Sequence, residues 1–131
     1  MLRVKVTAGV IRREDRILLA RRAGLDPLAG KWEFPGGKIE EGEGAEACLR
    51  RELREELGIA AKVGRFLGFT RHDYPEQRVE LLFYDVECIG SEVTPRIHDR
   101  VAWVRLSELA SYDLAPADVE FAGTLMRGGN L

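Results

Sequence analysis

The segment 45–57, AEACLRRELREEL, limits most strongly how this chain can fold. It contains neither glycine nor proline, and Gly58 follows at the place where a left-handed residue commonly ends a helix. Leu49, Leu53 and Leu57 recur every four residues, so one face of this helix is apolar. The fold must therefore provide a surface, such as a sheet, that covers the leucine face.

A second face of the same helix carries three carboxylates. With Glu52 as the reference, Glu55 and Glu56 lie about 60° to one side and about 40° to the other. Arg51 can pair with Glu55, but the like charges of Glu52 and Glu56 weaken the helix, and more so if they are partly buried. Carboxylate oxygens clustered in this way suit Mg²⁺, although a solvated glutamate-rich face explains the three residues equally well.

The rest of the chain predicts strands and turns around this helix. We expect strands over 3–13, 16–21, 61–72, 78–89 and 101–106, a loop over 24–31 and a final helix over 116–127. Turns are expected at Glu14-Asp15, at Tyr74-Pro75 and at Pro35-Gly36-Gly37, the last because glycine reaches positive φ at low cost. Ser107 is expected to cap a short helix. This order predicts an α/β (α+β) fold with a mixed sheet and packed helices.

Length and composition indicate one globular domain over residues 1–131. Hydrophobic residues make up 45% and charged residues 32%, which argues against disordered and fibrous chains. No apolar run approaches the roughly 20 residues of a membrane helix, and we expect no secretory signal. Cys48 and Cys88 lack the spacing of a metal site, so we interpret them as reduced thiols in a cytoplasmic protein.

Charge is small overall but unevenly distributed. The net charge of −2 indicates no general affinity for a nucleic-acid polymer. Residues 1–31 contain eight Lys and Arg, whereas residues 39–56 contain seven Glu. A polyanion bound through a divalent cation would use such a pair of regions, and solvated surface charge is the alternative interpretation.

A longer motif surrounds the carboxylate helix. Gly37 is followed by five residues and Glu43, then by seven residues and Arg51-Glu52-Leu53, and then by Glu55-Glu56 and Gly58-Ile59. This spacing matches the Nudix box, G-x5-E-x7-R-E-U-x-E-E-x-G-U, at every specified position. The chain therefore resembles the Nudix hydrolases, most closely the MutT-like nucleoside triphosphate pyrophosphohydrolases with their CTP-hydrolysing branch, from about residue 3 to about residue 126.

The resemblance implies a mixed β-sheet sandwiched between helices, with the box as a loop-helix-loop. It also implies that the Gly36 carbonyl and the carboxylates of Glu52, Glu55 and Glu56 hold Mg²⁺, for which Mn²⁺ could substitute. Glu43 and Arg51 would support and orient these glutamates, and Glu52 or Glu55 would act as the base. The implied reaction is attack of water on a nucleoside triphosphate, which gives the monophosphate and pyrophosphate.

The resemblance extends to residues that would bind substrate. Arg22 matches a phosphate-contacting arginine and Lys38 could add positive charge, although both could be ordinary surface bases. Glu33-Phe34 lies in the base-facing segment, and Tyr74 matches an aromatic residue that lies against the base, or else packs within its turn. Asp118 stands where the 8-oxoguanine-selective enzyme has asparagine. If ionised, its carboxylate would accept a hydrogen bond from the N4 amine of cytosine, and it could also stabilise a helix N-terminus.

One position departs from the family pattern. Ile97 stands where related enzymes often have a glutamate ligand, so His98, Asp99 or Glu92 could take the place of that glutamate.

Two other functions stay open. A Nudix hydrolase of a nucleoside diphosphate derivative, such as ADP-ribose or a dinucleoside polyphosphate, is the enzymatic alternative. A non-catalytic nucleotide-binding module is the third reading. We expect a monomer or a weak homodimer with no membrane partner.

Overall fold

The computed structural model describes residues 2–24, 27–90 and 92–128. Its elements in chain order are β1 (Leu2–Arg13), β2 (Arg16–Arg22), β3 (Trp32–Glu33), β4 (Gly36–Lys38), α1 (Ala45–Leu57), β5 (Ala60–Asp73), β6 (Gln77–Ile89), β7 (His98–Arg105), the 3-10 helix η1 (Leu106–Ser111) and α2 (Pro116–Gly128). The strands form one sheet of order β3-β2-β1-β6-β5, with β4 beside β1 and β7 beside β2. Among the named strands, β1 and β6 pair in parallel and the others pair antiparallel.

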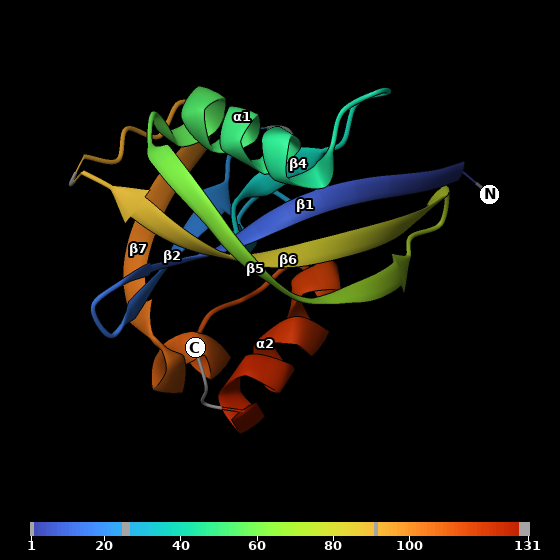
Figure 1. Ribbon diagram of the computed structural model, residues 1–131. Helices are drawn as coiled ribbons and strands as arrows, with labels where there is room; N and C mark the ends of the chain where they lie inside the picture. The colour runs from blue at the N-terminus through green and yellow to red at the C-terminus, as the bar shows by residue number, and fades with distance from the viewer. Residues whose placement is uncertain (1, 25–26, 91, 129–131) are drawn as a thin grey trace.

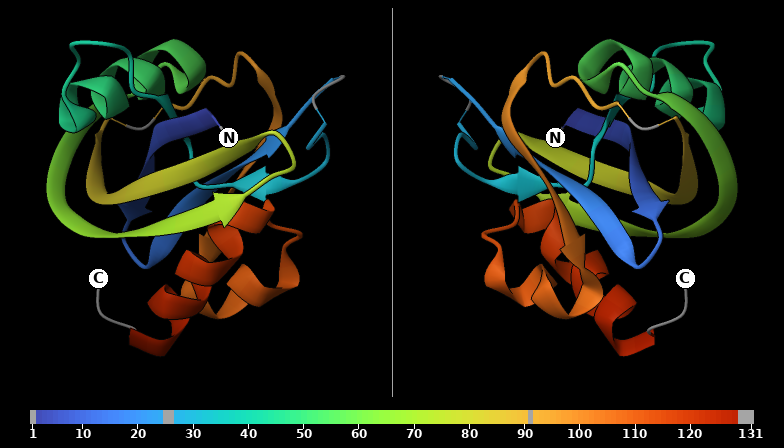
Figure 2. Two further views of the ribbon diagram at one scale, coloured as in Figure 1. Left: turned by 90° about the vertical axis from the view of Figure 1, so that its right-hand side faces the viewer. Right: turned by 90° about the vertical axis from the view of Figure 1, so that its left-hand side faces the viewer.

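The two α-helices cover opposite sides of this sheet, which confirms the predicted mixed sheet between helices (Figures 1 and 2). On one side, the leucine face of α1 packs against apolar side chains of β1, β2 and β6. On the other side, Phe121 of α2 stacks on Phe83 of β6 with ring centroids 3.9 Å apart. The helices thus cover the central strands on both faces, and α1 is docked by the leucines that its sequence spacing predicts.

Helix α1 ends at the predicted glycine. Gly58 has φ 65°, and its backbone N–H donates to the carbonyl of Arg54 at 3.0 Å. The segment before β7 also binds this end of the helix, since the Thr94 and Arg96 N–H groups donate to the Leu57 and Glu56 carbonyls at 2.8 and 2.9 Å. The start of β7 is therefore held close to the last turn of α1.

The predicted turn at Pro35-Gly36-Gly37 is wrong. The chain bends at Pro35, but Gly36 and Gly37 are extended in β4 and pair with Ala8 and Thr7 of β1. Glycine is required at both positions because the neighbouring atoms leave no room for a Cβ atom. A Cβ at Gly36 would overlap the backbone carbonyl of Thr7, and a Cβ at Gly37 would overlap the carboxyl group of Glu52. Glycine thus allows β4 to lie directly against β1 and α1.

Smaller differences concern the C-terminal half of the chain. Strand β7 begins at His98, three residues before the predicted strand, because it pairs with the full length of β2. Ser107 lies inside η1 and does not cap it, and the Glu108 carboxylate instead accepts the N–H of Arg105 at 2.8 Å. Residues 25 and 26 of the predicted loop lie outside the described residues. Neither of the described helices has the length and apolar character required to cross a membrane.

Candidate active site

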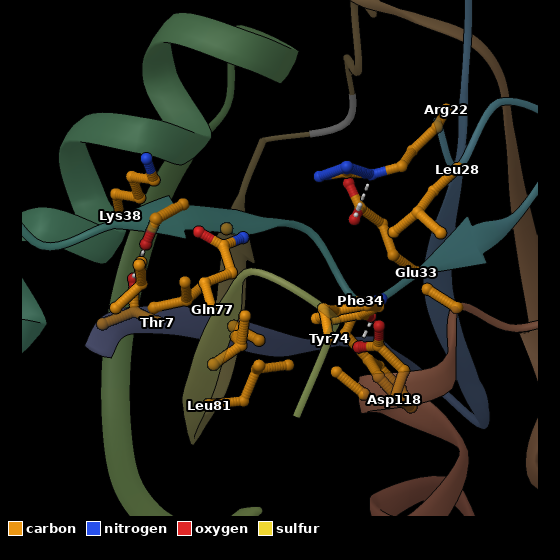
Figure 3. A pocket seen from close by; sticks show the side chains of 18 residues that line it. Thr7, Arg22, Leu28, Glu33, Phe34, Lys38, Tyr74, Gln77, Leu81 and Asp118 are labelled. Atoms are coloured by element: carbon orange, nitrogen blue, oxygen red, sulfur yellow. Dashed lines mark hydrogen bonds and ion pairs between the residues drawn. The ribbon is translucent and has the colours of Figure 1, made fainter. Parts of the chain in front are cut away.

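Two adjoining cavities form a cleft between α1, β4, β6 and the N-terminal end of α2. A cavity of about 460 Å³ extends toward the carboxylates of α1, and one of about 190 Å³ extends toward the apolar strands and α2. Both cavities are lined by Arg22, Glu33, Gly36, Gly37 and Lys38. The cleft therefore joins an acidic end to an apolar end through a shared middle, part of which Figure 3 shows.

The acidic end contains two carboxylates one helical turn apart. Glu52 and Glu56 both line the larger cavity. Burial, followed by the negative charge of Glu52, raises the pKa of Glu56 to about 8. The Oε2 atom of Glu56 is buried and has no hydrogen-bond partner among the described residues. In the absence of a cation, this pair of carboxylates is stabilised by holding a proton.

Arg51 organises the acidic residues around this pair. Its Nε and Nη2 donate to the two Glu43 oxygens at 2.7 and 2.9 Å, and its Nη1 donates to Glu52 at 2.9 Å and to Glu55 at 3.3 Å. The guanidinium of Arg51 is the main reason that the pKa of Glu43 is lowered to about 2. One planar cation therefore fixes the loop before α1 and a cleft carboxylate together.

The three predicted metal-ligating glutamates are not equally placed. Glu52 and Glu56 line the cleft, whereas the side chain of Glu55 is 56% exposed and lines neither cavity. Within residues 2–24, 27–90 and 92–128, no three His, Cys, Asp or Glu side chains form a group that could hold a metal ion alone. The unpartnered oxygen of Glu56 nevertheless fits a cation that takes few protein ligands and completes its shell with phosphate and water, as Mg²⁺ does.

The apolar end combines two aromatic side chains with one buried carboxyl group. Phe34 and Tyr74 line it together with Asp118, which lies in the first turn of α2 (Figure 3). The Asp118 carboxyl is buried and accepts a long hydrogen bond, 3.4 Å, from the backbone N–H of Phe34. Burial, followed by the charge of Glu33, raises the pKa of Asp118 well above that of an exposed aspartate. Such a carboxyl holds a proton more readily than an exposed one does, and a protonated carboxyl both donates and accepts hydrogen bonds.

A chain of three polar side chains lies at the junction of the two cavities. Arg22 ends β2, Glu33 lies in β3 and His98 begins β7. The Arg22 Nε donates to Glu33 Oε1 at 3.0 Å, and His98 Nε2 lies 2.8 Å from Glu33 Oε2. The predicted residues Arg22 and Glu33 are therefore brought together, and His98 joins them.

The three candidates for the metal ligand that is missing at Ile97 differ in whether they line the cleft. Ile97 itself is 60% exposed and lines the acidic cavity. Asp99 is exposed and accepts two hydrogen bonds from Arg21, and Glu92 is exposed and lines neither cavity. Of the three candidates, His98 alone lines the cleft.

The strand residues that line the smaller cavity were not predicted as site residues. The apolar ones are Val4, Val6 and Ala8 of β1 and Val79 and Leu81 of β6, and the polar ones are Thr7 and Gln77. Alternation along both strands does indicate an apolar face. It does not distinguish a filled core from a cavity, because that depends on which element covers the face.

Comparison with known proteins agrees with this architecture. The chain is 36% identical over 126 residues to the CTP pyrophosphohydrolase of Escherichia coli (strain K12), covering 96% of this chain and 93% of that protein. It is 34% identical over 128 residues to the 8-oxo-dGTP diphosphatase of the same strain, with 97% and 99% covered. The crystal structure of the MutT protein from Methanosarcina mazei Go1 matches with a TM-score of 0.89 and 27% identity, covering 99% and 97% of the two chains.

The fold and the cleft, together with these similarities, define an enzyme of the hydrolase class. The family model of the NUDIX domain matches residues 1–125 of this chain. The chain belongs to the Nudix family, and the expected family membership is confirmed. Nudix hydrolases generally need a divalent metal ion.

Proposed function

We propose that this chain is a Mg²⁺-dependent nucleoside triphosphate pyrophosphohydrolase that releases a nucleoside monophosphate and pyrophosphate. The observation that supports this most strongly is the buried Glu56 oxygen beside Glu52, which has no partner in the described part of the chain and lies at one end of a cleft whose other end is largely apolar. A triphosphate that spans the cleft would bring its phosphates to the carboxylates through a cation. Relatives named CTP pyrophosphohydrolase and 8-oxo-dGTP diphosphatase support this substrate class.

The residues of α1 and β4 would hold the metal. We assign Glu52, Glu56 and the Gly36 carbonyl as ligands at the cleft, with Glu55 as a further ligand on the same helix. A bound Mg²⁺ neutralises phosphate charge and lowers the pKa of water. Glu52 or Glu55 would accept the proton of the attacking water, while Arg51 and Glu43 keep the glutamates oriented.

The middle and the apolar end of the cleft would bind the rest of the substrate. Arg22 and Lys38 would contact phosphate, and Phe34 and Tyr74 would enclose the base. A protonated Asp118 offers an adjacent donor and acceptor. Cytosine presents its N4 amine beside N3, and oxidised guanine presents N7–H beside O6, so both match this pair. The raised pKa of Asp118 thus extends the expected bases beyond those with amine donors, which an ionised Asp118 would favour.

A nucleotide panel tests the proposal. Purified protein is incubated with CTP, dCTP, dGTP, 8-oxo-dGTP, ADP-ribose and a dinucleoside polyphosphate in Mg²⁺ or Mn²⁺, and pyrophosphate, phosphate and AMP are measured separately. We expect pyrophosphate from a triphosphate and at least a hundredfold loss in Glu56→Gln. Release of AMP from the diphosphate derivatives alone would indicate the second substrate class. Tight binding without turnover would indicate a nucleotide-binding module.

We also propose that residues 1–131 act as one Nudix domain in the cytoplasm, as a monomer or weak homodimer with no membrane partner. Light scattering during gel filtration measures the oligomeric state, and a stable tetramer would contradict the proposal.

A further inference from the structure

The geometry points to His98 as a positioning residue that orients Glu33, and through it Arg22, at the junction of the two cavities. Nε2 of His98 and Nε of Arg22 bind the two different oxygens of the Glu33 carboxylate. The inference rests on the proposed function, since it concerns how the middle of the cleft meets a nucleoside triphosphate.

The register of β7 turns His98 toward the cleft. Arg100 pairs with Arg21 and His98 pairs with Arg22, so Asp99 is an extra residue opposite β2. Regular alternation would leave residues 98 and 100 on the same side, but Arg100 is exposed whereas His98 is buried. Such a bulge re-aims a side chain. The Asp99 carboxylate binds Arg21 at 2.7 and 3.1 Å on the exposed side, which holds the bulge in place.

The hydrogen bonding of His98 argues against a role as simple core filling. Its side chain is 1% exposed. A carboxylate only accepts, so Nε2 is the donor in the bond to Glu33. Nδ1 is buried without a partner among the described residues. Burial of an unpaired polar atom is unfavourable, and an apolar side chain would avoid that cost. The bond from Nε2 to Glu33 is the benefit that a histidine provides here.

The position of Glu33 explains why its orientation matters. Glu33 lines both cavities and so lies between the carboxylates of α1 and the buried Asp118. The Glu33 carboxylate binds Arg22, which lines both cavities. A free rotation of Glu33 would therefore move a charge and the Arg22 guanidinium at the place where base and phosphates join. His98 restrains both through one hydrogen bond.

Three substitutions at position 98 separate this role from packing. Glutamine can place an amide N–H near the position of Nε2, asparagine can place one only near Nδ1, and leucine offers none. For a triphosphate substrate, we expect His98→Leu and His98→Asn to raise KM about tenfold with little change in kcat. His98→Gln should stay within about threefold of the unaltered protein. Combined with Glu33→Ala, His98→Leu should cause no further loss, because the two residues act as one unit.

The matched control removes an ion pair away from the cleft. Asp85 binds Arg12 through two hydrogen bonds of 2.6 Å and lines neither cavity of the cleft. Asp85→Asn should leave KM unchanged. Equal KM values for His98→Leu and the unaltered protein would overturn the inference, as would an equal loss in His98→Leu, His98→Asn and His98→Gln.

Nuclear magnetic resonance gives a test that needs no turnover. The chain has only two histidines, so the ¹⁵N signals of His98 are assigned by their loss in His98→Leu. We expect a ring protonated at Nε2, and a shift of the Arg22 Nε–H signal in His98→Leu but not in His98→Gln. A proton on Nδ1 alone would refute the inference. Absence of hydrolysis with these signals intact would refute the proposed function and leave the positioning role supported.

Discussion

Replacement of Glu56 by glutamine should make the metal-free protein more stable at pH 8 while it abolishes hydrolysis. The pKa of Glu56 is about 8 in the folded chain against an ordinary value of 4.5, because of burial and of the charge of Glu52. One pKa unit corresponds to about 1.4 kcal/mol, so ionised Glu56 lowers the free energy of unfolding by at most about 5 kcal/mol. Because part of this cost arises from the charge of Glu52, we expect a gain of about 2–4 kcal/mol in Glu56→Gln at pH 8.

The pH dependence has a defined sign. The folded chain binds the Glu56 proton more tightly than the unfolded chain does, so this group costs no stability below about pH 4.5. Between pH 4.5 and about 8, the free energy of unfolding of the unaltered protein should fall relative to that of Glu56→Gln. Urea unfolding in a metal chelator at several pH values, followed by tryptophan fluorescence, measures both curves.

Added Mg²⁺ should reverse the order of the two proteins. A cation bound at Glu56 stabilises the unaltered fold by mass action and leaves the glutamine variant little changed. Glu46→Gln serves as the matched control, because Glu46 lies on the same helix, is exposed and lines neither cavity of the cleft. The reasoning is refuted if Glu56→Gln is less stable than the unaltered protein in chelator at pH 8, or if the two pH curves run parallel.

Three further substitutions test other parts of the cleft. Asp118→Ala should change the base preference in the nucleotide panel more than the maximal rate, and a uniform loss over all bases would contradict this. Gly37→Ala should destabilise the protein by about 1–3 kcal/mol and reduce activity, because the added Cβ overlaps the carboxyl group of Glu52 in α1. Gly44→Ala is the control, because a Cβ at Gly44 meets open space, and chemical denaturation measures the stability of both variants. Arg51→Lys should weaken the stabilisation that ionised Glu43 provides above pH 4.5 and that is lost as the pH falls toward 2, which acid unfolding measures.

Much of the fold could be predicted because its signals are local. The four-residue spacing of leucines and the glycine after them predict α1 and its end, and β-branched residues predict the strands that cover it. Helical spacing also predicts that Arg51 can pair with Glu55, and this ion pair is present at 3.3 Å. The shorter ion pair of Arg51 with Glu43, at 2.7 Å, was not predicted. Local spacing thus suffices where the partners lie in one helix.

Features that depend on contacts between distant segments could not be predicted. The extended conformation of Gly36 and Gly37 follows from the approach of β1 and α1, which no local pattern reveals. His98 turns inward because of a bulge that forms only when β7 pairs with β2. The raised pKa of Asp118 follows from its burial, whereas its place in the sequence suggests an ionised residue that accepts from a base or stabilises a helix N-terminus.

The packing of α1 explains how a cleft with repelling carboxylates can exist before a metal binds. Leu49, Leu53 and Leu57 are each 0% exposed, and full burial of a leucine contributes about 1.5–3 kcal/mol. Together they contribute roughly 5–9 kcal/mol, which equals or exceeds the cost of at most about 5 kcal/mol from ionised Glu56. The helix therefore stays docked without a cation and keeps Glu52 and Glu56 in position. Removal of metal should then lower the melting temperature while the circular dichroism spectrum at 20 °C stays that of a folded protein.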